Sequence, residues 1–106
     1  MRLLFDQGTP VPLRQSLAHH EVTTAYENGW SQLKNGDLLD VAEDAGVEVL
    51  VTTDLNLKHQ QNLRLRRIAF VVLSTPSWPR IQRAVDTVVR AVDGATPSSY
   101  VEVDIP

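Results

Sequence analysis

Three short apolar runs constrain the fold of this chain more than any other feature. They fill the segments 2–5, 48–53 and 67–73, and apolar residues follow one another there without polar alternation. Continuous apolar runs of this length are typical of strands that are buried on both faces of a parallel sheet. Segments with helical spacing separate them, which predicts βαβ units. We therefore expect an α/β fold with a mostly parallel sheet and helices on both faces.

Periodicity, caps and chain breakers place the elements. We expect strands at 2–5, 20–24, 48–53, 67–73 and 100–103, helices at 11–17, 35–45 and 81–92, and shorter helices at 25–29 and 57–63. Thr9 should cap the helix 11–17, with Pro10 at its first position. Asn35 should cap the helix 35–45, and Gly46 should end it. The helical spacing directs four residues of that helix to the core, namely Leu38, Val41, Ala42 and Ala45.

The length of the chain bounds its organisation. Its 106 residues suffice for one domain and are too few for two. We expect residues 1–95 to form that domain. The segment 96–106 is predicted to be a C-terminal tail or an edge strand of the same domain, partly disordered from Thr96 on.

The composition excludes several kinds of site. The chain has no cysteine, which excludes disulfides, zinc–thiolate sites and thiol catalysis. Its formal net charge is −3, whereas proteins that bind long nucleic acids through their overall field are usually basic. Any contact with nucleic acid must then be local or assisted by a metal. We see neither a signal peptide nor the roughly 20 apolar residues that span a membrane. We therefore expect a cytoplasmic protein without membrane contact.

Three aspartates are the strongest clue to function. Asp6 and Asp54 directly follow expected strands, and Asp37 lies in the first turn of the helix 35–45. Ligands of open α/β sheets bind outside the carboxyl ends of the strands, where Asp6 and Asp54 should meet and which Asp37 could reach. Carboxylates gathered in one place repel one another unless a cation compensates them. The pattern predicts a Mg²⁺ or Mn²⁺ site formed by these three aspartates.

Each aspartate also has a purely structural explanation. Asp6 could form an Asx-turn, Asp54 could cap the helix 57–63, and Asp37 could simply complement the helix dipole. Asn56, two residues after Asp54, would give the same loop a second oxygen donor. Asp40, three residues after Asp37, is a reserve candidate for the metal site, whereas Glu43 and Asp44 should be solvated.

The histidines are weaker candidates. His19 and His20 precede the expected strand 20–24, away from the predicted acidic edge, and lack the i, i+4 spacing of a helical zinc site. We interpret this pair as a surface turn. His59 follows Asp54 closely and could touch a substrate, although a surface position is the simpler interpretation.

The order of these segments resembles the small stand-alone PIN-like proteins of bacteria. These are relatives of the PIN-domain ribonucleases, which include the VapC-type toxins of toxin–antitoxin pairs. The segments that carry the resemblance are 1–6, the proline-marked helix, 20–24, 29–39 and 49–57. The most specific of them is the strand that ends in Thr52, Thr53 and Asp54.

The resemblance implies a three-layer α/β/α fold and a nuclease site. PIN nucleases gather three or four acidic residues around one or two Mg²⁺ or Mn²⁺ ions, and by position Asp6, Asp37 and Asp54 match three of them. The fourth position of many PIN-like proteins is an aspartate, and this chain has Asn56 there. The replacement removes one negative charge and should weaken a second metal site. PIN-like proteins often form homodimers, and a toxin would have an antitoxin-like partner.

Three functions compete at this point. In the first, a ribonuclease, Asp6, Asp37, Asp54 and Asn56 form the catalytic site, and His59, Gln60 and Arg64 line the path of the RNA. The second is a catalytically weakened PIN-like module that binds a protein, which Asn56 favours. The third is a receiver-like or phosphatase-like protein. Receivers usually carry two adjacent acids after the first strand, and Asp6 is followed by Gln7.

Overall fold

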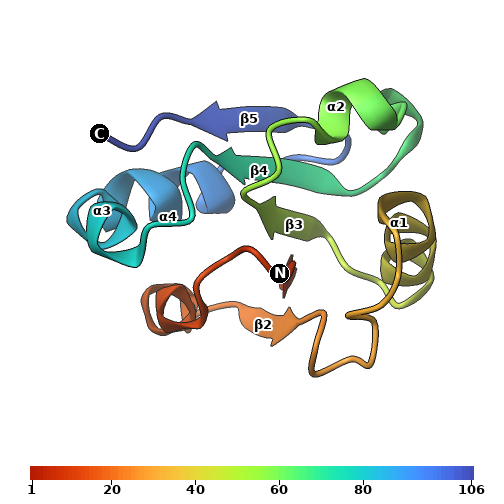
Figure 1. Cartoon of the computed structure of the whole chain (residues 1–106), viewed down its shortest axis with the longest axis horizontal. Coiled ribbons are helices and arrows are strands. Elements are labelled where there is room, and N and C mark those ends of the chain that lie inside the picture. Colours follow the sequence, from red (N-terminus) through yellow and green to blue (C-terminus); the bar gives the residue numbers. More distant parts are fainter.

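Five parallel strands form the central sheet of the computed structural model, which describes all residues 1–106. Their bounds are β1 (Arg2–Phe5), β2 (Glu21–Thr24), β3 (Val49–Thr52), β4 (Ala69–Leu73) and β5 (Tyr100–Val103). The strand order is β2-β1-β3-β4-β5, and every neighbouring pair is parallel. The chain passes from β1 to β2 on one side of β1 and then returns to place β3 on the other side. The strand order therefore reverses between β1 and β3 (Figure 1).

Helices cover both faces of this sheet, which confirms the expected three-layer α/β/α fold. One face carries the 3₁₀ helix η1 (Val11–Leu17) with α3 (Trp78–Arg83) and α4 (Val85–Asp93). The other carries α1 (Asn35–Asp44), α2 (Leu57–Gln60) and the 3₁₀ turn η2 (Leu63–Leu65). Figure 1 shows α3 and α4 on one side of the sheet and α1 on the other.

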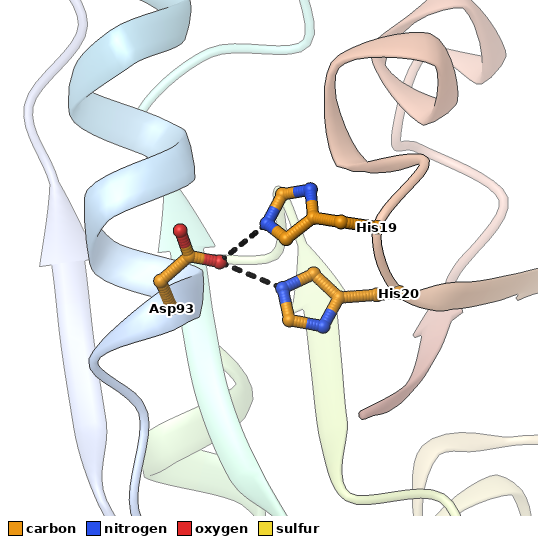
Figure 2. A group of neighbouring side chains, drawn as sticks. All are labelled: His19, His20 and Asp93. Carbon is orange, nitrogen blue, oxygen red and sulfur yellow. Dashed lines mark hydrogen bonds and ion pairs between the residues drawn. The ribbon is translucent and has the colours of Figure 1, made fainter.

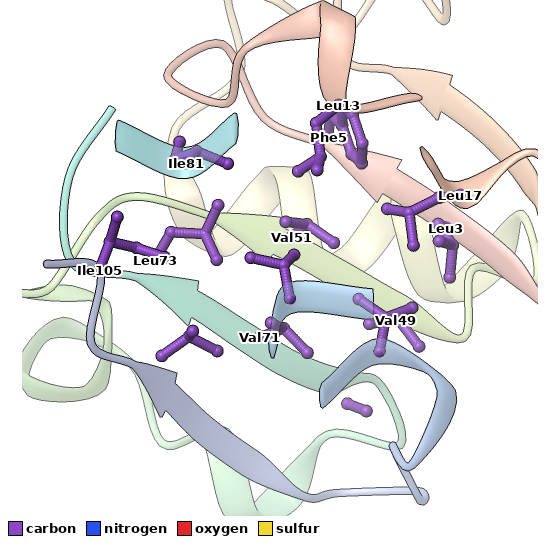
Figure 3. Packing of buried hydrophobic residues seen from close by; sticks show 14 residues of the cluster. Leu3, Phe5, Leu13, Leu17, Val49, Val51, Val71, Leu73, Ile81 and Ile105 are labelled. Carbon is purple, nitrogen blue, oxygen red and sulfur yellow. The ribbon is translucent and has the colours of Figure 1, made fainter. Parts of the chain in front are cut away.

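Alternation along each strand divides the core into two clusters. Leu3 and Phe5 of β1 point to the side of η1, α3 and α4, whereas Leu4 between them points to the side of α1. The first cluster contains 14 buried residues, among them Val49, Val51, Val71 and Leu73 (Figure 3). The three apolar runs are thus buried on both faces, as the sequence predicts.

The crossover connection from β4 to β5 has an unusual hand. The chain continues in one direction through β3, β4 and β5, but α2 lies on one face and α3 with α4 lie on the other. The β4–β5 crossover therefore has the opposite hand to the β3–β4 crossover, although crossovers in proteins are almost always of one hand. In this arrangement α3 and α4 cover, with η1, the face that Val51 of β3 and Val71 of β4 line.

Two predicted helix caps are wrong. Thr9 does not cap η1, which begins after Pro10 and has no side-chain cap; its hydroxyl bonds to Asp6 and to the backbone of β3 instead. Asn35 is the first residue of α1 rather than its cap, and its amide reaches Asp54. In both places a polar side chain near a helix start bonds to a group at the end of β3, which is Val51 for Thr9 and Asp54 for Asn35. Gly46, with φ +80°, does end α1 as predicted.

Other differences concern element bounds. Residues 25–29 form turns rather than a short helix, and the expected helix 57–63 is the shorter α2 followed by η2. The final helix breaks at Ala84 into α3 and α4. On α1, Leu39 is buried in place of the exposed Ala45. The segment 96–106 is ordered: β5 pairs with β4, and Ile105 beyond it is buried. No helix has the length and apolar character that crossing a membrane requires.

Candidate functional site

Asp6 and Asp54 lie at the carboxyl ends of two neighbouring strands. Asp6 follows β1, and Asp54 follows β3 by two residues. Phe5 pairs with Val51 in the register of these strands, so Asp6 stands opposite Thr52. The strand order reverses between these two strands, and doubly wound sheets bind their ligands at such a reversal. The predicted meeting of these two aspartates at one edge of the sheet is confirmed.

Thr52 joins the two aspartates. Its hydroxyl donates a hydrogen bond to Oδ2 of Asp6 and accepts one from the backbone N–H of Asp54 at 3.0 Å. Thr52 is 1% exposed, so this link is shielded from water. A β-branched side chain at the end of a buried strand thus fixes the relative positions of both acids.

Thr9 holds the other oxygen of Asp6. Its hydroxyl lies 2.8 Å from Oδ1 of Asp6 and 2.9 Å from the carbonyl oxygen of Val51, and both are acceptors when Asp6 is ionised. A hydroxyl has one hydrogen to share between them. If Asp6 carries a proton on Oδ1, that proton can go to Thr9 and the Thr9 hydrogen to Val51, which satisfies all three groups. The geometry therefore suits a protonated Asp6 well.

The charge of Asp6 is poorly compensated. Burial raises the pKa of the Asp6 carboxyl, and the neighbouring charge of Asp54 raises it further. Hydrogen bonds from Thr52, Thr9 and the backbone of Gly8 act in the opposite direction. Neither Asp6 nor Asp54 takes part in any of the ion pairs of the protein. A cation at this edge would relieve both carboxylates.

Asp54 is oriented by two further contacts. Its Oδ1 accepts a hydrogen bond from the backbone N–H of Asn56 at 2.9 Å, which is the Asx-turn that the sequence allows. Its Oδ2 accepts one from the side-chain amide of Asn35 at 3.3 Å. The same amide nitrogen donates to Oε1 of Gln60 at 2.7 Å, so α1 and α2 together position Asp54.

Asp37 does not join this pair. It is exposed on α1, and no hydrogen bond connects it to Asp6 or Asp54. The three predicted ligands do not form a group whose carboxylate oxygens all lie within 4.8 Å of one another. Asn35, two residues earlier, is the α1 residue that reaches the site. Sequence reasoning took Asn35 for a helix cap and so missed it.

The reserve candidate Asp40 has another partner. Its carboxylate pairs with Arg66 at 2.5 Å, and Glu43 pairs with the same guanidinium at 2.8 Å. Glu43 is therefore not the freely solvated residue that we expected. Arg66 is therefore paired with two acids.

Of the predicted substrate residues, Gln60 is the one that the hydrogen bonds connect to Asp54. His59 and Gln60 are exposed on α2, and Gln60 is tied to the site through Asn35. Arg64, which is exposed and forms no ion pair, lines a cavity of about 430 Å³ together with Lys58 and Tyr100. Neither Asp6 nor Asp54 lines this cavity.

A smaller cavity lies directly at Asp6. It has a volume of about 140 Å³ and is lined by Asp6, Gly8, Asn35 and residues of the segment 25–33. The volume is small for a drug-sized ligand, whose pockets usually enclose roughly 300–1,000 Å³. The cavity is therefore too small to enclose such a ligand.

A second cluster, which sequence reasoning missed, contains His19, His20 and Asp93. Nε2 of His19 and Nε2 of His20 lie 2.8 Å and 2.7 Å from Oδ1 of Asp93 (Figure 2). Asp93 ends α4, more than 70 residues after the histidines, so no local pattern could have shown the cluster. It lies at the amino ends of the strands, opposite Asp6.

No protein-family model, curated protein or solved structure matches this chain. A function therefore has to be argued from the acidic site itself.

Proposed function

We propose that this protein is a Mg²⁺- or Mn²⁺-dependent ribonuclease of the PIN-like type, acting in the cytoplasm. One observation carries the proposal: two carboxylates without a cationic partner, Asp6 and Asp54, share Thr52 at the point where the strand order reverses. The order of strands and acids along the sequence, which resembles that of PIN-like proteins, also supports the proposal. A role as the toxin of a toxin–antitoxin pair would follow from the same resemblance.

The residues present fit a hard divalent cation. Mg²⁺ and Mn²⁺ prefer carboxylate and carbonyl oxygens, and Mg²⁺ usually takes only one or two carboxylates from the protein together with waters. Asp6 and Asp54 supply that number. Each carboxylate oxygen has two lone pairs, so the hydrogen bonds from Thr9, Thr52 and Asn35 leave room for a further ligand.

The residues around the site would have different roles. Asp6 and Asp54 would hold the cation, which would acidify a water and stabilise charge on the phosphoryl oxygens. Thr52 and Asn35 fix the orientation of these carboxylates. The side chain of Asn56 is exposed next to Asp54 and makes no hydrogen bond, so it can orient water or a phosphate oxygen. His59, Gln60 and Arg64 would contact the RNA.

Calorimetric titration of Mn²⁺ is the first test, because it requires no knowledge of the substrate. We expect saturable binding to the unchanged protein and none to the double variant Asp6→Asn, Asp54→Asn. The variant Asp37→Asn decides whether Asp37 is a ligand, and we expect this variant to bind Mn²⁺ with unchanged affinity. Asp44→Asn, an exposed acid on α1 without an ion pair, is the matched control.

Cleavage of a labelled single-stranded RNA with Mg²⁺ or Mn²⁺ tests the activity. The rate should fall roughly a hundredfold or more in Asp6→Asn, since the charge that positions the cation is lost. A rate that is unchanged in Asp6→Asn, or that survives removal of divalent cations with a chelator, would exclude the assignment.

A second candidate is a protein-binding module on the same fold. Asn56 in place of a fourth acid favours it, and so does the 81% exposure of Leu65 beside α2. Such a module would bind an antitoxin-like protein or form a homodimer. Absence of Mn²⁺ binding together with a stable complex in light-scattering measurements would favour this function over catalysis.

A further inference from the structure

The amino ends of the strands carry a second group of metal-ligating side chains. His19 and His20 lie in the turn before β2, and Asp93 is the last residue of α4. We propose that these three residues form a binding site for a transition-metal ion of the Zn²⁺ type, separate from the acidic edge at Asp6.

The ligand atoms already converge. Both Nε2 atoms lie within 2.8 Å of Oδ1 of Asp93, and the ligand atoms of all three residues lie within 4.8 Å of one another. In a tetrahedral zinc site with bonds of about 2.0–2.1 Å, neighbouring ligand atoms stand about 3.3 Å apart. Small outward shifts of three side chains would therefore open the space that an ion needs, without movement of the backbone.

The rings are oriented for a shared ligand. Adjacent residues in an extended chain point to opposite sides, but the turn before β2 directs both imidazoles toward Asp93 (Figure 2). Their ring centres are 4.1 Å apart. The side chain of His20 is only 9% exposed, so its position is fixed by packing, whereas His19 and Asp93 are open to solvent and admit an ion.

The position of Asp93 favours a cation beside it. A carboxylate at the C-terminal end of a helix opposes the helix dipole, and a positive charge there is stabilising. Carboxylates are ordinarily ionised at neutral pH, as a metal ligand must be. Oδ2 of Asp93 makes no hydrogen bond and could bind the ion as well.

The donor atoms select the type of metal. Two imidazole nitrogens and one carboxylate suit Zn²⁺ and its neighbours, whereas Mg²⁺ prefers oxygen ligands alone. Three protein ligands leave a fourth position for water or another group. The amine of Met1 lies 3.0 Å from Nδ1 of His20, on the far side of the ring from Asp93, so it is not a ligand in this arrangement. A bound ion would fasten the end of α4 to the turn before β2.

Titration of Zn²⁺ into the untagged chain, followed by calorimetry, tests the proposal. We expect one ion per chain, and affinities at least roughly tenfold weaker in His19→Gln and in Asp93→Asn, since each removes one ligand. His59→Gln is the matched control, because it removes the third histidine on the distant α2 and should leave zinc binding unchanged. The double variant Asp6→Asn, Asp54→Asn should also bind zinc normally, which separates this site from the acidic edge.

Thermal unfolding gives a second readout. Zinc should raise the Tm of the unchanged protein in a concentration-dependent way and should fail to do so in His19→Gln, whose side chain is exposed and whose fold is expected to survive. Two outcomes would overturn the proposal: no stoichiometric binding to the unchanged protein, or binding that persists in both His19→Gln and Asp93→Asn. Either would leave the cluster as a hydrogen-bonded tie between α4 and the turn.

Discussion

The hydroxyl of Thr52 donates to Asp6 while it accepts the N–H of Asp54, so one buried side chain on β3 serves both acids. Thr52→Val keeps the shape of the residue and removes both hydrogen bonds. We expect the free energy of unfolding to fall by about 1–3 kcal/mol, since a buried N–H and a carboxylate oxygen lose their partner. The pKa of Asp6 should rise further, because the lost hydrogen bond favours the ionised form.

Urea unfolding and NMR titration of the Asp6 carboxyl carbon measure these two effects. Thr53→Val is the matched control, because the hydroxyl of Thr53 makes no hydrogen bond. Equal losses of stability in both variants would contradict the special position of Thr52.

Asp6→Asn should make the metal-free protein more stable at neutral pH. Burial raises the pKa of Asp6 in the folded protein, so folding favours the protonated form. The stability that this group contributes is therefore present below the unfolded pKa of about 3.9 and is lost as the pH rises through the folded value. Asparagine is neutral at every pH and can donate to Thr9 in the place of that proton.

Urea unfolding over a series of pH values checks this behaviour. The two proteins should have similar stabilities near pH 4, and the variant should gain an advantage as the pH rises. Addition of Mn²⁺ should raise the stability of the unchanged protein and leave that of the variant unchanged. The opposite result would be a difference in free energy of unfolding that moves in favour of the unchanged protein between pH 4 and pH 7. That result would show that the fold stabilises Asp6 in its ionised form.

Tyr100 should ionise only at very high pH. Its burial, followed by its hydrogen bond to Glu102 at 3.0 Å, raises its pKa to about 12. In Tyr26→Phe it is the only tyrosine left, so ultraviolet titration reads it directly. Glu102→Gln should lower this pKa only in part, because burial is the larger cause.

The same group gives a stability prediction. Because the folded pKa is raised, the contribution of Tyr100 to stability is present below the unfolded value of about 10 and is lost as the pH approaches about 12. A titration midpoint near 10 in Tyr26→Phe would mean that the ring is more open to water than the structure shows.

Gly46→Ala should cost stability on the order of 1 kcal/mol. Gly46 has φ +80° at the end of α1, where a side chain is strained, and a Cβ atom there would lie 3.1 Å from Nη1 of Arg2. Gly36→Ala is the matched control: it lies inside α1, and a Cβ atom would lie 3.4 Å from the flexible amide of Gln61. Thermal unfolding should show a loss in the first variant and none in the second.

The sequence predicts the strands well, because a strand that is buried on both faces has to be apolar throughout. It also places Asp6 and Asp54 at one edge, since parallel strands end on the same side. The caps failed for a physical reason: Thr9 and Asn35 have the chemistry of caps, but groups at the end of β3 take their hydrogen bonds, the carbonyl oxygen of Val51 from Thr9 and the carboxylate of Asp54 from Asn35. Local patterns contain no information about such partners.

Two further features are outside the reach of local patterns. The face on which α3 and α4 pack, beside Val51 of β3 and Val71 of β4, is defined only in the assembled sheet. The meeting of His20 with Asp93 joins residues that are 73 positions apart. Both arise from the topology and not from any segment alone.

The single hydrogen of the Thr9 hydroxyl has a consequence for how the acidic edge would work. Since Val51 and Asp6 both need it, the arrangement is complete only when one extra positive charge is present, as a proton on Asp6 or as a cation beside it. A proton and a metal ion would then compete for the carboxylate of Asp6. Any enzyme built on this site would lose its cation as the pH falls, because the raised pKa of Asp6 lets a proton compete with the metal for the carboxylate.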